Sequence, residues 1–177
     1  MGEAVGQIKV VVVRGKKLVI RDLKSSDPYV ILKLGNQTAK TKVINSCLNP
    51  VWNEEFSFPF SEPVGSLELE VFDKDRFKAD DKMGHARISL QPLIAAARLK
   101  QILQVSGSEK GMTLRKVIPE SDNCLAGEST IISGNNNEVI QDVWLRLCEV
   151  ESGEIEIKIK VVKLPSSPVA STTAKMS

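Results

Sequence analysis

The sequence of 177 residues predicts an all-β fold, an antiparallel sandwich of eight strands in a single domain. Short segments alternate apolar and polar residues, which buries one face of a strand and exposes the other. Turn-prone residues separate these segments at regular spacing, as is typical of a sandwich. Hydrophobic residues make up 42% and charged residues 26% of the chain, the composition of an ordinary globular domain.

Eight segments carry this strand pattern in chain order. The first, containing IKVVVV, is short and β-branched and is bounded by Gly15, so it predicts a strand and not a helix. The last, EIEIKIKVV, has the longest alternation. The eight expected strands are 7–13, 29–34, 38–44, 55–60, 66–72, 86–90, 143–147 and 154–162.

An insert at about 92–138 interrupts this series between the sixth and seventh strands. Unstructured links longer than ~15 residues are uncommon in compact domains, so the insert must contain structure. Pro92 suits the first turn of a helix, and the Ala- and Leu-rich LIAAARLKQIL that follows predicts a helix to Leu103. Two more strands are expected at 113–118 and 129–133. The domain is expected to span 1–164, and the tail 165–177 has little to bury and is predicted to be disordered.

Composition argues against several functions. His85 is the only histidine, and no phosphate-binding or dinucleotide-binding glycine motif occurs, so we expect no enzyme. Aromatic residues make up 5% of the chain and the net charge is only +2, so we expect no nucleic-acid partner. The three cysteines form no CxxC pair and are interpreted as reduced thiols. With no apolar run long enough for a membrane span, we expect a cytoplasmic protein.

Two acidic segments suggest a metal site. Asp22 and Asp27 follow the first strand, whereas Asp73, Asp75 and Asp81 follow the fifth. Carboxylates that meet at one end of a sandwich repel one another unless a cation neutralises them. Ca²⁺ is the candidate because it accepts six to eight oxygen ligands in flexible geometry. The alternative is that these aspartates only form turns and a solvated loop.

The stretches RDLKSSDPYV, NPVWNEEFSF and VFDKDRFKADDKMG resemble the C2 domain, whose calcium ligands lie in such loops. The long alternating strand stands last, which resembles the type II topology of that fold. The resemblance implies carboxylate ligands and, in addition, backbone carbonyl ligands. The implied carboxylates are Asp22, Asp27, Asp73, Asp75 and Asp81, with Asp80 as a further acid, and the implied carbonyls are those of Arg21, Lys74 and one of Lys78 or Ala79.

The same resemblance implies contact with anionic phospholipid membranes. Leu23 and Phe77 stand at the expected loop tips and would enter the headgroup region, although Phe77 could instead fold into the core. The basic neighbours Lys24, Arg76 and Lys78 would meet anionic lipids. A second surface of Lys33, Lys40 and Lys42 is a candidate phosphoinositide site, because Lys40 and Lys42 would share one strand face. The alternative is a solvated edge strand protected by lysines.

Two further stretches, LRKVIPESDNCLAGESTI and VIQDVWLRLCEVESGEIEIKI, resemble the plant C2-domain abscisic-acid-related family. This resemblance covers about residues 5–164. It implies calcium-dependent phospholipid binding, recruitment of abscisic-acid receptors to the plasma membrane, and stimulation of a YchF-type G protein without catalysis by the chain itself. It also implies a protein at the periphery of the plasma membrane, with the nucleus as a further location. The alternative is a calcium-independent adaptor or GTPase regulator that acts through residues 92–138.

Overall fold

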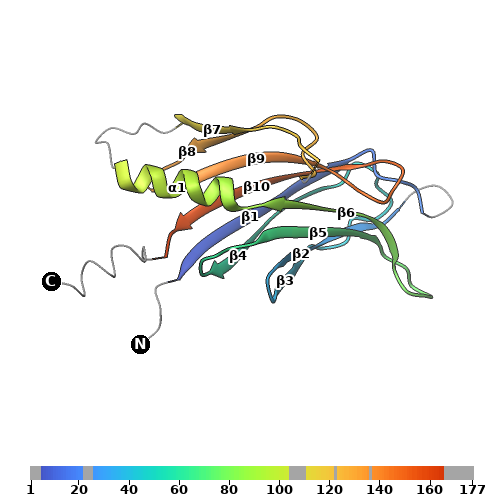
Figure 1. Cartoon of the computed structure of the whole chain (residues 1–177). Helices are drawn as coiled ribbons and strands as arrows, with labels where there is room; N and C mark the ends of the chain where they lie inside the picture. The colour runs from blue at the N-terminus through green and yellow to red at the C-terminus, as the bar shows by residue number, and fades with distance from the viewer. Residues whose placement is uncertain (1–4, 22–25, 104–110, 122, 136, 166–177) are drawn as a thin grey trace.

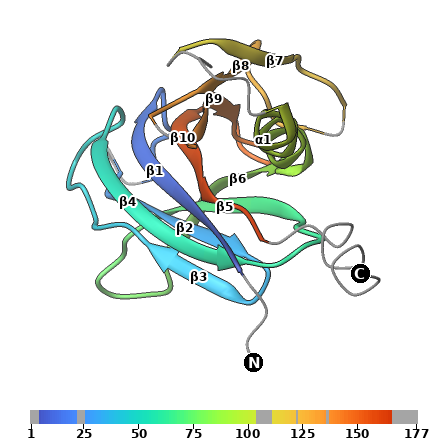
Figure 2. The same cartoon turned by 90° about the vertical axis from the view of Figure 1, so that its left-hand side faces the viewer.

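The computed structural model describes residues 5–21, 26–103, 111–121, 123–135 and 137–165. Within them the chain forms ten strands and one helix, packed as two antiparallel sheets (Figures 1 and 2). The all-β prediction is therefore confirmed. The elements are β1 Gly6–Lys16, β2 Pro28–Leu34, β3 Gln37–Lys40, β4 Val51–Phe60, β5 Ser66–Asp73, β6 Asp81–Ser89, α1 Gln91–Leu103, β7 Thr113–Val117, β8 Ser129–Ser133, β9 Val139–Arg146 and β10 Glu154–Lys163.

Strand order follows the expected topology. One sheet has the order β3-β2-β5-β6, and the other has the order β4-β1-β10-β9-β8-β7. The first and last strands lie side by side and antiparallel, with Val10 opposite Ile159. The type II arrangement that the position of the long last strand predicted is therefore observed.

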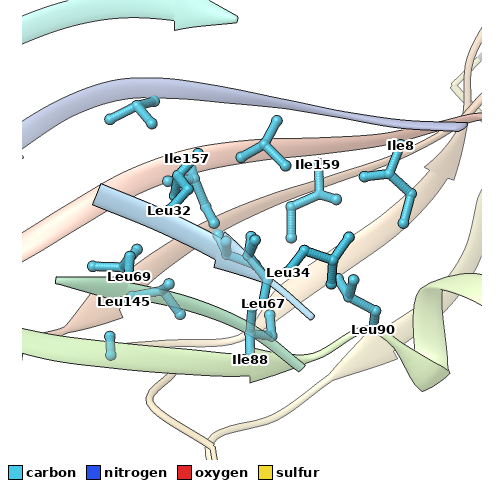
Figure 3. Packing of buried hydrophobic residues seen from close by; sticks show 14 of the residues in the cluster. Ile8, Leu32, Leu34, Leu67, Leu69, Ile88, Leu90, Leu145, Ile157 and Ile159 are labelled. Carbon is cyan, nitrogen blue, oxygen red and sulfur yellow. The ribbon is translucent and has the colours of Figure 1, made fainter. Parts of the chain in front are cut away.

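The core lies between the two sheets and comes from the alternation seen in the sequence. In β1, Ile8 and Val10 are fully buried, and in β10 Ile157 and Ile159 are fully buried. They face Leu32, Leu67, Leu69 and Ile88 of the smaller sheet (Figure 3). Full burial of each such side chain contributes about 1.5–3 kcal/mol.

The insert is part of the sandwich. Helix α1 buries Leu93, Ile94, Ala96 and Ala97 against the core, while β7 and β8 extend the six-stranded sheet beyond β9. The predicted helix and both predicted strands are confirmed. Within the described residues no helix is long and apolar enough to cross a membrane. The predicted tail lies outside the described residues, apart from Pro165.

Several strand boundaries were wrong. The strands β4, β6 and β9 begin at Val51, Asp81 and Val139, four or five residues before the expected positions 55, 86 and 143. The segment expected at 38–44 ends as a strand at Lys40. Thr41 is buried, and its hydroxyl accepts the Val30 backbone N–H at 2.9 Å and donates to the Lys42 carbonyl at 3.0 Å. The Lys42 N–H donates to Glu54 and not to a neighbouring strand. A threonine hydroxyl that replaces a ladder partner ends the strand, so Lys42 is not part of β3.

Candidate metal centre and membrane face

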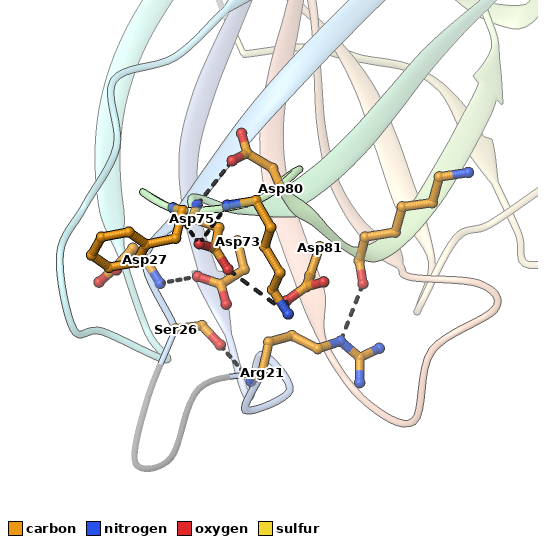
Figure 4. Close-up of polar contacts among 10 residues, drawn as sticks. Arg21, Ser26, Asp27, Asp73, Asp75, Asp80 and Asp81 are labelled. Carbon is orange, nitrogen blue, oxygen red and sulfur yellow. Dashed lines mark hydrogen bonds and ion pairs between the residues drawn. The ribbon is translucent and has the colours of Figure 1, made fainter.

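Strand register brings three predicted ligands together. Pro28 of β2 pairs with Asp73 of β5, and Asp73 pairs with Asp81 of β6. Asp27 directly precedes Pro28, so Asp27, Asp73 and Asp81 stand at the same end of three adjacent strands (Figure 4). Segments that are far apart in the sequence thus converge through antiparallel pairing alone.

Backbone hydrogen bonds fix the two inner carboxylates. Asp73 is only 1% exposed, and its Oδ1 accepts the Asp27 backbone N–H at 2.8 Å. Asp27 Oδ1 in turn accepts the Ser46 N–H at 2.7 Å, and the Lys74 N–H donates to the Asp27 carbonyl at 3.0 Å. The loop after β1, the loop after β5 and the segment 41–50 are therefore tied to one another around these two side chains.

Asp75 organises the loop between β5 and β6. Its Oδ1 accepts the backbone N–H groups of Phe77 at 2.8 Å and Lys78 at 3.2 Å, the pattern of an aspartate that closes a turn. Its Oδ2 lies 3.9 Å from Lys78 Nζ, and Asp81 Oδ2 lies 4.0 Å from the same ammonium nitrogen. Two carboxylates from opposite sides of the loop thus face one positive charge.

Asp80 belongs to a different group of contacts. Its Oδ2 accepts the Tyr29 hydroxyl, its Oδ1 accepts the Asp75 N–H at 2.9 Å, and Lys74 Nζ lies 4.0 Å away. The bond from Tyr29 lowers the pKa of Asp80, and the bond from Asp75 and the charge of Lys74 add to this effect. Figure 4 shows the Asp80 carboxylate directed away from those of Asp73 and Asp81. Asp80 supports the loop in this conformation.

The predicted metal ligands are only partly described. Asp22 lies outside the described residues, and within them no group of three or more His, Cys, Asp or Glu side chains is close enough to hold a metal ion. The Arg21 side chain is engaged elsewhere, because its Nε donates to the Lys82 carbonyl at 3.1 Å and its Nη1 lies 3.3 Å from Glu151. The calcium site therefore stays a prediction that rests on Asp27, Asp73, Asp75 and Asp81.

The loop tip between β5 and β6 presents an apolar residue among cations. Phe77 is 97% exposed, so the alternative in which it folds into the core is wrong. Arg76 and Lys78 on either side of it are also exposed. Leu23 and Lys24, the expected tip of the other loop, lie outside the described residues.

The lysine surface is less uniform than the sequence pattern suggested. Lys33 Nζ pairs with Glu70 at 3.0 Å. Lys40 Nζ lies 4.5 Å from the ring centre of Tyr29, a cation–π contact. Lys42 is exposed but lies beyond the end of β3, so it does not share a strand face with Lys40. A phosphoinositide site here stays a prediction.

Comparison with known proteins identifies the family. A model of the C2 domain matches residues 6–105. Protein C2-DOMAIN ABA-RELATED 11 of Arabidopsis thaliana is 65% identical over 167 residues, which cover 94% of this chain and 99% of that protein. The chain belongs to the C2-domain ABA-related family. GTPase activating protein 1 of Oryza sativa subsp. indica is 45% identical over 167 residues, covering 94% of this chain and 98% of that protein.

Solved structures agree on the fold. A single C2 domain of plant Extended Synaptotagmin 1 superposes with a TM-score of 0.56 at 22% identity, covering 94% of this chain and 99% of that chain. The calcium-bound pair of C2 domains of Extended-Synaptotagmin 2 gives a TM-score of 0.62 at 23% identity. The match covers 92% of this chain but only 48% of that two-domain chain. The solved structures thus show the C2 fold for this member of the C2-domain ABA-related family.

Sequence reasoning missed several contacts that shape this C2-domain ABA-related protein. The Tyr29–Asp80 bond joins the start of β2 to the loop between β5 and β6, and Ser46 supplies a backbone amide to Asp27. Neither contact could be inferred from the spacing of a sequence motif. The only signal was DPYV, which places a tyrosine two residues after a candidate ligand.

Proposed function

We propose that this protein attaches to anionic phospholipid membranes when calcium fills the site at the β2–β5–β6 end. The proposal is supported by the placement of Asp27, Asp73 and Asp81 at one end of three adjacent strands. Asp75 lies in the loop between two of these strands, where it accepts the backbone N–H of the exposed Phe77. The donor set fits the ion, because carboxylate oxygens are the ligands that calcium prefers. The Lys78 ammonium between Asp75 and Asp81 marks a position where these two carboxylates already share a cation.

The charge around the loops explains how occupancy would control attachment. The bound ion would supply positive charge and coordination positions for lipid phosphate oxygens. Without neutralisation the carboxylates oppose approach to a negative bilayer. Once they are neutralised, Arg76 and Lys78 attract anionic lipids at about 1 kcal/mol each near the surface. Phe77 then enters the headgroup region, where its burial contributes about 1.5–3 kcal/mol.

The test is co-sedimentation with phosphatidylserine and phosphatidylcholine vesicles, with calcium or with a chelator. We expect the wild-type chain to bind only phosphatidylserine vesicles and only with calcium. The double variant Asp75→Asn with Asp81→Asn should lose this binding. Asparagine keeps the side-chain oxygen that accepts the Phe77 amide, so the loop turn is preserved while the charge is removed.

A matched control is Asp142→Asn, which removes an exposed carboxylate from β9 that pairs with Lys158. It should bind like wild type. Calcium-dependent binding by the Asp75/Asp81 variant that equals wild-type binding would contradict the proposal. Wild-type binding that persists in the presence of the chelator would also contradict it.

We also propose that the insert carries a protein partner to the membrane. Four large apolar side chains on and around α1 and β7 are exposed, namely Leu99, Ile102, Met112 and Ile118. Leu99 and Ile102 are three residues apart on α1 and therefore share one helix face, and adjoining exposed apolar side chains are typical of a protein contact. The relatives named for ABA and for GTPase activation suggest an abscisic-acid receptor or a YchF-type G protein as the partner, with the chain stimulating and not performing GTP hydrolysis.

Deletion of the insert cannot test this, because α1 and β8 complete the core. The double variant Leu99→Asp with Ile102→Asp should instead weaken binding to purified receptor or G protein at least tenfold by titration calorimetry, while vesicle binding persists. Val51→Asp, a matched change of an exposed apolar residue on β4, should have no effect. Unchanged partner affinity in the double variant would reject the insert as the docking surface.

A further inference from the structure

The thiols of Cys124 and Cys148 lie next to each other. Their sulfur atoms are 3.6 Å apart, although the residues are 24 positions apart in sequence, and both residues are half-buried. Cys124 belongs to the segment of the insert between β7 and β8, whereas Cys148 is the second residue of the loop between β9 and β10. The contact therefore bridges the insert and the remainder of the sandwich.

Backbone pairing on both sides holds the two cysteines in place. Leu125 pairs with Leu145 in an antiparallel bridge, and the Arg146 N–H donates to the Cys124 carbonyl at 2.7 Å. Cys148 exchanges both backbone hydrogen bonds with His85 of β6, at 2.7 and 3.2 Å. The main chain thus fixes both residues, and the closeness of the sulfurs is not the result of one rotamer alone.

A disulfide bond needs the sulfurs at about 2.05 Å, so small side-chain rotations separate the present contact from a bond. We propose that Cys124 and Cys148 form an oxidisable dithiol, a modification site at which a peroxide closes an intramolecular disulfide between the insert and the β9–β10 loop. The proposal is independent of calcium and of lipid.

The surroundings assign the two thiols different roles. Cys124 Sγ accepts the Arg87 backbone N–H at 3.5 Å, whereas the Cys148 thiol donates to the Arg146 carbonyl at 3.9 Å. Burial raises the pKa of the Cys148 thiol, and the neighbouring Cys124 raises it further. Cys124 is therefore the thiol that attacks the oxidant, and Cys148 is the thiol that resolves the product.

The reaction has two balanced steps. Cys124 sulfur attacks one oxygen of hydrogen peroxide, the O–O bond breaks, and a sulfenic acid and one water form. Cys148 sulfur then attacks Cys124 sulfur, the S–O bond breaks, and the hydroxyl leaves as a second water with the thiol proton. Two thiols are oxidised by two electrons, and the peroxide is reduced to two water molecules.

The experiment uses the reduced full chain, treated with an equimolar amount of hydrogen peroxide and analysed by thiol counting and by peptide mapping without reductant. We expect two of the three thiols to disappear, a monomer that has lost two hydrogen atoms, and a cross-linked pair of peptides that contain Cys124 and Cys148. The loop closed by the bond should raise the melting temperature by roughly 5–15 °C, and dithiothreitol should reverse this.

Variants separate this pair from the third thiol. Cys47→Ser should form the same disulfide, whereas Cys124→Ser should form none and show no reversible rise in melting temperature. Cross-links that include Cys47, disulfide-linked dimers, or independent oxidation of single cysteines with no Cys124–Cys148 peptide would each overturn the proposal. The wild-type peptide map decides between these outcomes even where a variant folds poorly.

Discussion

At the scale of single residues, the described aspartates differ in what they do. Asp73 and Asp27 are fixed by backbone amides, Asp75 and Asp81 share the Lys78 ammonium, and Asp80 accepts the Tyr29 hydroxyl. All five looked alike as acidic loop residues in the sequence. Only the pairing of the strands and the course of the loop distinguish them, because hydrogen-bond partners depend on residues far away in the chain.

Phe77 gives a prediction about the membrane face. Replacing it by serine should leave the free energy of unfolding within about 0.5 kcal/mol of wild type, because the side chain is 97% exposed. Binding to phosphatidylserine vesicles in calcium should weaken roughly ten- to a hundredfold, because about 1.5–3 kcal/mol of burial is lost. Urea unfolding and vesicle titration measure the two quantities.

The control for Phe77 is Ile102→Ser, which changes another highly exposed apolar residue. Ile102 lies near the end of α1, which Figure 1 shows at the end of the molecule away from the acidic loops. Its vesicle binding should match wild type. Equal binding by Phe77→Ser and wild type would place the membrane contact elsewhere.

Tyr29 gives a prediction about pH. Burial, together with the bond to Asp80, raises its pKa to about 12. The unfolded chain ionises this hydroxyl near pH 10, so the stabilisation is complete below pH 10 and is lost as the pH rises through about 12. The chain has one tyrosine, so tyrosinate absorbance reports this group directly.

An alkaline titration of the wild-type chain should therefore show a midpoint near 12, and Asp80→Asn should lower it while leaving it above 10. Asparagine removes the negative charge but not the burial. A wild-type midpoint at 10 would mean that the Tyr29–Asp80 contact does not form in solution.

At the scale of elements, the alternation of apolar and polar residues predicted the strands well, because a strand with one buried face requires that alternation. In the insert, α1 and β8 were predictable for the same reason, because each presents a face to the core, whereas the residues of β7 are exposed or half-buried. The strand end at Lys40 was not predictable, because the Thr41 hydroxyl replaces a main-chain hydrogen-bond partner there. This replacement leaves the alternation of apolar and polar residues unchanged.

Gly84 in β6 gives a prediction about how the two sheets are joined. Its φ is +104°, and a Cβ there would lie 2.6 Å from Val150 and 3.0 Å from Leu147. Gly84→Ala should therefore lower the free energy of unfolding by about 1–3 kcal/mol, from backbone strain and crowding against the β9–β10 loop. Gly65→Ala is the matched control, since nothing lies within 4 Å of its Cβ position. Equal stability of the two variants in urea would reject this close contact.

At the scale of the whole molecule, the two ends of the sandwich carry different tasks. The acidic residues and Phe77 lie at one end, and Figure 1 shows α1, the start of β1 and the end of β10 at the other. A membrane contact at the loop end leaves the exposed apolar residues of α1 free to meet a partner. The sequence indicated the acidic segments and the insert separately. Their placement at opposite ends of the molecule follows from the strand pairing.

We propose that separate loops of this chain build one site for calcium. Titration calorimetry of the chain with calcium, in the absence of lipid, measures binding at this site without the contribution of the membrane. Saturable heat is expected for wild type and for Asp142→Asn, and its loss is expected in the Asp75→Asn and Asp81→Asn double variant. Absence of saturable heat in wild type, or identical heat in the double variant, would contradict the proposal.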